Sequence, residues 1–106
     1  MRAVEAKMVK AAKYGNTLHS ANTVVYSGGD IYLHGNHIAT VHPNGIVTVN
    51  LYTLRRWPTP TTKSRLRALD VDVYTKNHIT YIGDRSIYDI PSDFLDVETG
   101  YNYQRA

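Results

Sequence analysis

Hydrophobic side chains near the start of the chain recur three or four positions apart. One stripe of a helix would contain Val4, Met8, Ala11 and Ala12, while the charged side chains of Glu5, Lys7, Lys10 and Lys13 would point away from it. Gly15 follows, and glycine tolerates the left-handed backbone at which helices commonly end. The pattern therefore predicts an amphipathic N-terminal helix over residues 3–14.

Between residues 22 and 52, hydrophobic and polar residues alternate with the period of two that is typical of half-buried strands. Turn sequences separate the alternating runs at Ser27-Gly28-Gly29, Gly35-Asn36 and His42-Pro43-Asn44-Gly45. We therefore expect an antiparallel meander that follows a polar loop at residues 16–22. Its predicted strands cover residues 22–26, 31–34, 37–41 and 46–52.

The turn types also predict which side chains share a face of the sheet. A two-residue turn at Gly35-Asn36 pairs His34 with His37 and Tyr32 with Ala39. A shift of the register by one residue would exchange the two faces. The face expected toward the core contains Tyr32, Ala39, Val41, Val47, Val49 and Leu51.

Two prolines stiffen the segment that begins at Trp57. Residues 57–60 are expected to be extended, because a residue before proline avoids the helical region. Thr61 or Thr62 is predicted to cap a short helix near residues 62–69. The leucines of this helix would attach it to the sheet, and its lysine and arginines would lie on the exposed side.

The remaining chain alternates again and then becomes acidic. Period-two spacing predicts a hairpin over residues 71–82. Beyond Gly83, Pro91-Ser92 is expected to open one helical turn that runs through Val97. Tyrosines lie among the acids of this tail, which is a composition found at protein interfaces. We favour the alternative in which the tail folds back on its own basic domain.

Together these segments predict an α+β fold, in which a small antiparallel sheet of about five or six strands is flanked by an N-terminal helix and the short helix near 62–69. A length of 106 residues fits one domain. We expect that domain over residues 1–83, with an acidic, tyrosine-containing C-terminal tail over residues 84–106 packed on it.

Composition and charge narrow the classes of function. The chain has no cysteine, which excludes disulfides and thiolate metal sites and favours a reducing compartment. No apolar run approaches the about 20 residues of a membrane span. Residues 1–83 carry ten lysines and arginines against four acids, whereas residues 84–98 carry five acids against Arg85. The charge is therefore divided between a basic body and an acidic tail.

The basic residues gather around the single tryptophan. Arginine and lysine compensate phosphates, helix N-termini and hydroxyls bind phosphate oxygens, and an aromatic ring stacks on an unpaired base. The alternative without a ligand is a solvated basic face, with Trp57 buried as an anchor of the core. The candidate nucleic-acid or phosphate-binding residues are Arg55, Arg56, Trp57, Thr61, Thr62, Lys63, Arg65 and Arg67.

Two histidines are the only weak metal candidates. The predicted hairpin places His34 and His37 side by side, about 5 Å apart at Cβ, and such a pair could begin a zinc site. Nothing in the sequence fixes a third ligand, so no metal and no cofactor is expected. Neither the spacing of a hydrolytic triad nor a glycine-rich phosphate loop occurs, so no catalytic residue is assigned.

Four segments in order resemble a family of small proteins encoded by tailed bacteriophages: NTVV from Asn22, IYLHGNHIA from Ile31, WPTPTTKSRL from Trp57 and VYTKNHITYI from Val73. Arg55-Arg56 and Arg67 depart from the family pattern and make this chain more basic. The resemblance implies a phage protein that works in the cytoplasm of an infected cell, without implying a reaction.

The expected function is therefore binding without catalysis. The first hypothesis is a phage accessory protein that contacts nucleic acid or nucleotide phosphates through the basic segment. The alternative is a protein that binds and inhibits a host enzyme or an anti-phage defence system. The partner is thus expected to be nucleic acid or a host protein, with no membrane, and a homodimer is left open.

Overall fold

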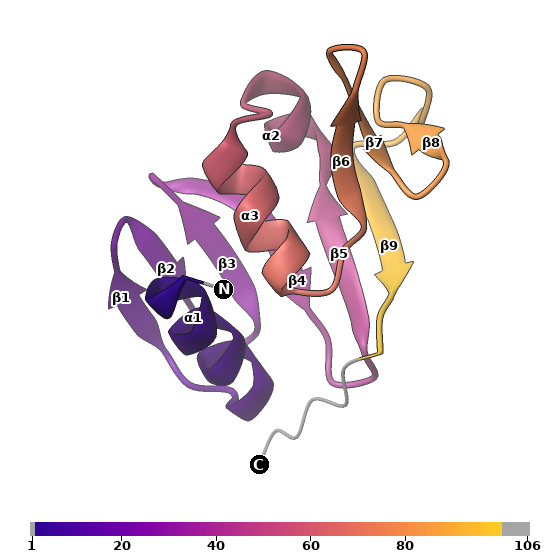
Figure 1. Ribbon diagram of the computed structural model, residues 1–106. Coiled ribbons are helices and arrows are strands. Elements are labelled where there is room, and N and C mark those ends of the chain that lie inside the picture. Colours follow the sequence, from indigo (N-terminus) through magenta and orange to yellow (C-terminus); the bar gives the residue numbers. More distant parts are fainter. Residues whose placement is uncertain (1, 101–106) are drawn as a thin grey trace.

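A computed structural model describes residues 2–100 of the chain (Figure 1). Its three helices are α1 (Ala3–Tyr14), α2 (Leu51–Arg56) and α3 (Pro60–Ala68). Its strands within the described part are β1 (Leu18–Ser20), β2 (Thr23–Val25), β3 (Asp30–Leu33), β4 (Asn36–Val41), β5 (Ile46–Asn50), β6 (Val73–Lys76), β7 (Ile79–Ile82), β8 (Arg85–Ser86) and β9 (Phe94–Glu98).

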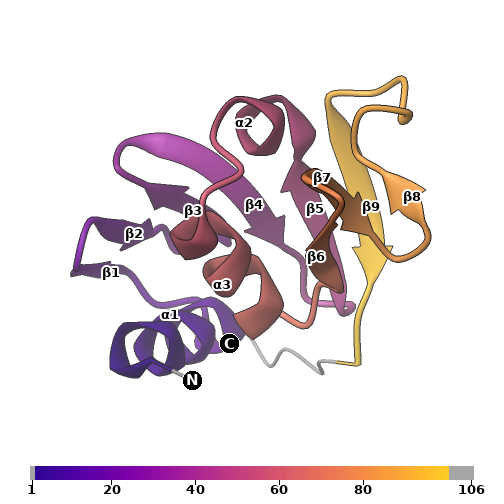
Figure 2. The ribbon, with the colours of Figure 1, turned by 45° about the horizontal axis from the view of Figure 1, so that its top comes forward.

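The strands form two antiparallel sheets. A six-stranded sheet has the order β1-β2-β3-β4-β5-β9, and a three-stranded sheet has the order β6-β7-β8. Figures 1 and 2 show α1 and α3 on the same face of the larger sheet. The α+β class, the N-terminal helix and the second short helix are therefore confirmed. Among the described helices, none is long and apolar enough to cross a membrane.

The N-terminal helix has the predicted bounds because its sequence supplies both the apolar stripe and the stop. Met8 and Ala12 are fully buried against the sheet. Gly15 adopts the left-handed conformation at φ 70°, and its N–H donates to the carbonyl of Ala11. The polar loop expected at residues 16–22 was wrong in part, because Leu18–Ser20 pairs with β2 as an edge strand.

The turn between β3 and β4 lies one residue earlier than predicted. His34 and Gly35 are the two central residues, at φ 51° and 79°, which is the backbone of a two-residue turn with both φ angles positive. Leu33 therefore pairs with Asn36. Ile38 is an extra residue that forms a bulge in β4, so that Ile31, and not Tyr32, pairs with Ala39. The predicted pair of His34 with His37 does not form.

This bulge corrects the predicted core face. Ile31 and Leu33 are buried beneath the helices, whereas Tyr32 points to the opposite face. The register across the next turn is as predicted, with Val41 opposite Val47 and Ala39 opposite Val49. The expectation was correct for β4 and β5 and wrong by one residue for β3.

Strand β5 ends at Asn50 rather than at Tyr52. The Asn50 side chain accepts a hydrogen bond from the Thr53 N–H at 3.1 Å and begins α2. Asparagine is among the best residues for this capping role. Leu51 and Leu54 of the new helix are buried, so apolar residues that continued the strand pattern belong instead to one side of a short helix.

Helix α3 begins two residues before the predicted start. Thr59 is its N-cap, and its hydroxyl oxygen accepts a hydrogen bond from the Thr62 N–H at 3.2 Å. Pro60 occupies the first helical turn, where its missing N–H costs no helical hydrogen bond. The cap is therefore Thr59, not Thr61 or Thr62, while Leu66 and Leu69 are buried as predicted and Arg67 is exposed as predicted.

The hairpin over residues 71–82 is confirmed as β6 and β7, but the acidic segment differs from the prediction. The helical turn expected over residues 91–97 does not form, because residues 94–97 belong to strand β9, which pairs with β5 along its length. The Leu51 N–H donates to the Asp93 carbonyl at 2.8 Å where the strand begins. The acidic segment thus completes the sheet. Residues 101–106 of the expected tail lie outside the described part.

Candidate functional site

The cations of the basic segment do not share one exposed side. Arg65 is 3% exposed. Its Nη1 lies 2.6 Å from the Glu5 Oε2, and its Nε donates to the Thr23 hydroxyl at 3.1 Å. The prediction that Arg65 faces solvent was wrong, because α1 brings a carboxylate against it from the far end of the chain.

The prediction that Glu5 points away from the buried side of α1 was wrong, because the side chain is 2% exposed, and its pairing with Arg65 holds it in its charged form. The Ser64 hydroxyl donates to its Oε2 at 2.6 Å, and the Arg2 N–H donates to its Oε1 at 3.4 Å. Burial raises the pKa of Glu5, but the hydrogen bonds from Ser64, Arg65 and Arg2 outweigh it, so the pKa is lowered overall. The pair joins α1, α3 and β2 and has a structural role.

Arg55 is also engaged within the fold. Its Nε donates to the Ile87 carbonyl at 3.0 Å, and its Nη2 donates to the carbonyls of Ile90 and Ser92 at 2.6 and 2.8 Å. Its Nη1 lies 3.3 Å from the Asp93 carboxylate. These bonds fix the connection between β8 and β9 to the last turn of α2.

Two further cations are tethered but remain nearer the surface. The Arg67 Nη1 donates to the Val73 carbonyl at 3.2 Å. The Lys63 ammonium donates to the Thr75 hydroxyl on β6. Both contacts bind α3 to the smaller sheet, so these side chains point toward β6 rather than toward Trp57.

Arg56 is the cation of the segment that faces solvent beside Trp57. Its guanidinium lies 5.2 Å from the ring centroid of Tyr52 and 5.2 Å from that of Trp57. Its Nη1 also donates to the Tyr52 hydroxyl at 2.9 Å. Trp57 is 42% exposed, so it is not a buried anchor of the core, as the alternative without a ligand expected. The three side chains form an exposed aromatic–arginine stack.

A pocket of about 350 Å³ lies between this stack and the β3–β4 turn. Pockets for small ligands commonly measure about 300–1,000 Å³, so this one suits a small molecule or a single side chain. Its apolar lining comes from Leu33, Ile38 and Trp57, and its polar lining comes from His34, Asn36, Thr53, Thr59, Thr61 and Thr62.

One buried polar group in this pocket has no partner in the described part of the chain. Thr53 is 6% exposed, and its hydroxyl has no hydrogen bond with any of residues 2–100. Buried hydroxyls in native proteins are nearly always bonded to protein, water or a ligand. The Asn36 amide and the Thr61 hydroxyl likewise have no partner within the described chain. The pocket therefore presents free donors and acceptors over an apolar floor.

The structure brings together four of the predicted residues, namely Arg56, Trp57, Thr61 and Thr62, at or beside this pocket. It directs the other four, Arg55, Lys63, Arg65 and Arg67, to contacts within the fold. Sequence reasoning missed Thr53 and Asn36. The spacing of Asn50 and Thr53 is that of an N-cap and its N3 residue, and could have indicated the helix that positions Thr53.

The two histidines occupy different environments. His34 lies in the turn and lines the pocket, whereas His37 pairs with Tyr32 on the opposite face of the sheet. Among the described residues, no group of three histidine, aspartate or glutamate side chains lies close enough to hold a metal ion.

Comparison with known proteins supplies one relationship. No curated protein and no solved structure matches the chain. The family model of the Kyanoviridae Gp96 protein matches residues 1–103. That range includes both sheets, the three helices and the pocket. The chain therefore belongs to the Kyanoviridae Gp96 family of phage proteins.

Proposed function

We propose that this phage protein is a non-enzymatic accessory protein that binds a nucleotide in the Trp57 pocket within the cytoplasm of the infected cell. The nucleotide is either free or an unpaired unit at the end of a strand. The observation that carries the proposal is the buried Thr53 hydroxyl, which has no partner among residues 2–100, in a pocket that is also lined by Trp57, the ring on which Arg56 stacks.

Each part of a nucleotide has a complementary group in this arrangement. A planar base fits the apolar surface of Leu33, Ile38 and Trp57, and tryptophan stacks on any base. The amide of Asn36 and the hydroxyl of Thr53 can bond the polar edge of the base.

The guanidinium of Arg56 stands against Trp57, and it supplies positive charge for one phosphate at the rim. A site with a single rim cation suits one nucleotide better than a long phosphate backbone.

Trp57 is the only tryptophan of the chain, so its fluorescence reports directly on the pocket. Titration with adenosine monophosphate and with a 15-residue thymidine oligonucleotide is expected to change that fluorescence saturably. For the oligonucleotide, one phosphate contact predicts a slope of log affinity against log salt of about −0.7, whereas five contacts would give about −3.5.

Thr53→Val removes the pocket hydroxyl at nearly constant volume and is expected to weaken nucleotide binding about fivefold, the value of one neutral hydrogen bond. Thr17→Val, in an exposed loop away from the pocket, is the matched control and should leave the affinity unchanged. Absence of any fluorescence change with either ligand at millimolar concentration would overturn the proposal.

The second candidate is binding to a host enzyme or defence protein. It is favoured by the stack itself, because tryptophan, tyrosine and arginine are the residue types that dominate binding energy at protein interfaces. Capture from infected cells that survives nuclease treatment, resists salt and is lost in Trp57→Ala would support this candidate over the nucleotide.

A further inference from the structure

The second face of the six-stranded sheet is open. Helices α1 and α3 cover only one face (Figure 2), and no helix of the described part lies over the other. Side chains on the open face follow from the register. Asp30 lies opposite Thr40, Thr40 opposite Thr48, and Thr48 opposite Asp96, so a polar row crosses four strands.

Two histidines extend this row, because each forms a hydrogen-bonded chain with one threonine and one aspartate. The single hydroxyl proton of Thr40 goes to the Asp30 Oδ1 at 2.5 Å. The His37 Nε2, 2.9 Å from the same hydroxyl, must therefore donate its proton to it. The His37 Nδ1 is then free to accept from the Asn50 amide at 3.1 Å.

The second chain repeats the first on the neighbouring strands. The Thr48 hydroxyl donates to the Asp96 Oδ1 at 2.6 Å, and the His42 Nε2 lies 2.8 Å from that hydroxyl. Each chain orients one aspartate through a threonine hydroxyl, and the His37 Nε2 also lies 3.6 Å from the Asp30 Oδ1. Neither carboxylate is paired with a lysine or arginine, and the Oδ2 of each accepts no hydrogen bond from residues 2–100.

Aromatic rings lie beside the polar row. The ring centroids of Tyr26 and Tyr32 are 5.5 Å apart, those of Tyr32 and His37 are 5.3 Å apart, and those of His37 and Phe94 are 6.3 Å apart. Phe94 is 51% exposed. The open face thus combines oriented carboxylates with accessible ring faces.

The charge of this face has one sign. Residues 15–54 and 86–100, which contain all six of its strands, include no lysine and no arginine. Asp30, Asp96 and Glu98 project from the open face. A chain whose net charge is +3 therefore presents a sheet surface that is locally negative.

We propose that this open face is a docking surface for an arginine-bearing segment of a partner protein. A guanidinium binds carboxylates through paired hydrogen bonds and stacks on aromatic rings, and the face offers both side by side. The carboxylates would repel phosphates, so a nucleic acid is not the ligand here. The surface is separate from the Trp57 pocket, whose lining residues Leu33 and Ile38 point to the covered face.

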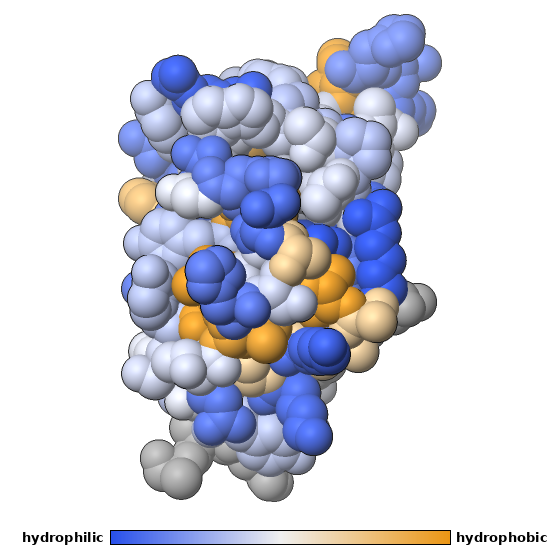
Figure 3. Space-filling view, turned by 90° about the vertical axis from the view of Figure 1, so that its left-hand side faces the viewer, coloured by the Kyte–Doolittle hydropathy of each residue, from blue (hydrophilic) through white to orange (hydrophobic). Residues whose placement is uncertain are grey.

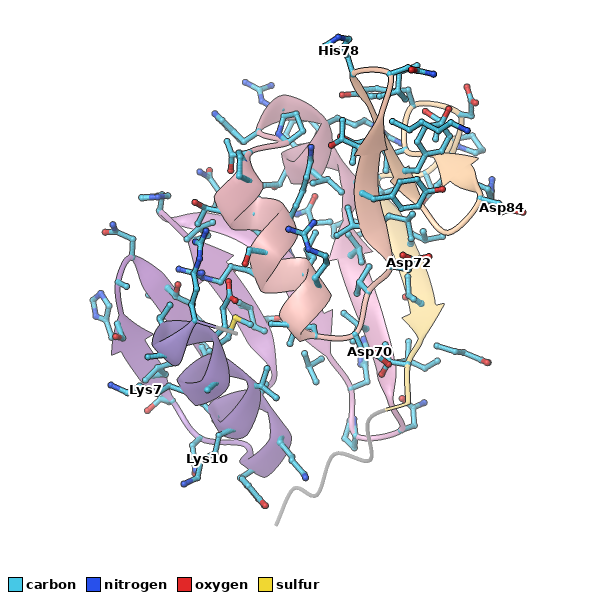
Figure 4. All side chains as sticks on the ribbon, in the orientation of Figure 1. Lys7, Lys10, Asp70, Asp72, His78 and Asp84 are labelled. Carbon is cyan, nitrogen blue, oxygen red and sulfur yellow. The ribbon has the colours of Figure 1, made fainter. Side chains whose placement is uncertain are left out.

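The test uses a fluorescein-labelled heptaarginine peptide and the full chain at about 50 mM salt, where exposed charges are weakly screened. The wild-type chain is expected to raise the anisotropy of the peptide despite its own positive charge. Asp30→Asn/Asp96→Asn keeps an acceptor for each threonine and should weaken binding at least tenfold. Asp72→Asn/Asp84→Asn removes the same charge elsewhere (Figure 4) and should change it less than twofold.

A third variant tests the aromatic part. Phe94→Leu keeps an apolar side chain but removes the ring, and it should weaken heptaarginine about threefold, the effect of one exposed cation–π contact. Chemical shifts of backbone amides in the wild-type chain should move on β3, β4, β5 and β9. Equal thermal unfolding midpoints would establish that each variant remains folded.

Three results would overturn the proposal: no binding of the peptide, equal loss in the Asp72/Asp84 control, or shifts confined to other surfaces. Light scattering measures whether the chain forms a dimer in solution. If the wild-type chain is a dimer and the Asp30→Asn/Asp96→Asn variant is a monomer, the open face binds the basic α1 of a second copy. That result would also overturn the proposal of a partner protein. Failure of nucleotide binding at Trp57 leaves these outcomes unaffected.

Discussion

Helix α1 and the α2–α3 segment are both basic, yet the second segment engages two of its arginines, Arg55 and Arg65, within the fold. Lys7 and Lys10 extend from α1 away from the body of the protein (Figure 4). Figure 3 shows the side of the molecule that includes α1 and β1, where strongly hydrophilic residues border an apolar patch. Arg55 and Arg65, by contrast, direct their charge into contacts that hold the fold together.

The comparison shows that the burial of a cationic side chain determines its role more than its position in a cluster of charged residues does. A guanidinium removed from water needs its donors filled, and α3 places Arg65 where Glu5 can do this. The lysines of α1 remain in water, where pairing gains little. Breaking contacts in the two regions should therefore have very different effects on stability.

The largest effect is expected for Arg65→Met. It leaves the Glu5 carboxylate buried without its cation, and should lower the free energy of unfolding by about 3–5 kcal/mol. Urea unfolding monitored by circular dichroism measures the change. Glu5→Leu/Arg65→Met, which leaves neither charge buried, should be more stable than the single variant. A single variant as stable as wild type would refute the structural role of the pair.

Arg55→Ala should have the next largest effect. It removes hydrogen bonds from a charged donor to the segment between β8 and β9, and should cost about 2–3 kcal/mol. Hydrogen exchange should accelerate first around Ile87 and Ile90. Arg85→Ala is the matched control, because that arginine is exposed, and its effect should stay within about 0.5 kcal/mol.

The pH dependence of stability should also depend on Glu5. Its pKa is lowered from the ordinary value of 4.5, so the folded state binds its proton less readily than the unfolded state does. The resulting contribution is full above pH 4.5 and is lost as the pH falls through the lowered pKa. Glu5→Gln should flatten this acid limb in thermal unfolding, whereas Glu98→Gln, on the exposed edge strand, should leave it unchanged.

The smallest effects on stability are expected for the exposed cations. Lys7→Ser and Arg56→Ser should each change the free energy of unfolding by less than about 0.5 kcal/mol. Arg56→Ser should nevertheless weaken nucleotide binding at the Trp57 pocket, while Lys7→Ser should not. A loss of stability for Arg56→Ser comparable to that of Arg55→Ala would remove the contrast between the two regions.

Local signals in the sequence were reliable where a few neighbouring residues decided the outcome. The stripe of Met8 and Ala12 with the stop at Gly15 was sufficient for α1. The alternation around Asn44-Gly45 was sufficient for the register of β4 and β5. Part of the candidate site was predicted in the same way, because Trp57 and its neighbours form one continuous segment.

Errors arose where alternatives had similar local energies. A turn at His34-Gly35 and one at Gly35-Asn36 both use a glycine, and the buried positions of Ile31 and Ile38 select between them. Leu51 fits a strand or a helix equally well, and the Asn50 cap selects the helix. In β9, pairing with β5 outweighs the helical turn that proline and serine suggested.

The sequence by itself determined the α+β composition, the bounds of α1, the β6–β7 hairpin and the concentration of positive charge around Trp57. Only the tertiary structure decided which of those cations reach solvent, because Arg65 and Arg55 are engaged by groups far along the chain: Glu5 for Arg65, and residues 87–93 for Arg55. Local spacing places a side chain on a face of its element. Burial and hydrogen bonding with distant segments determine whether its charge is available to a ligand.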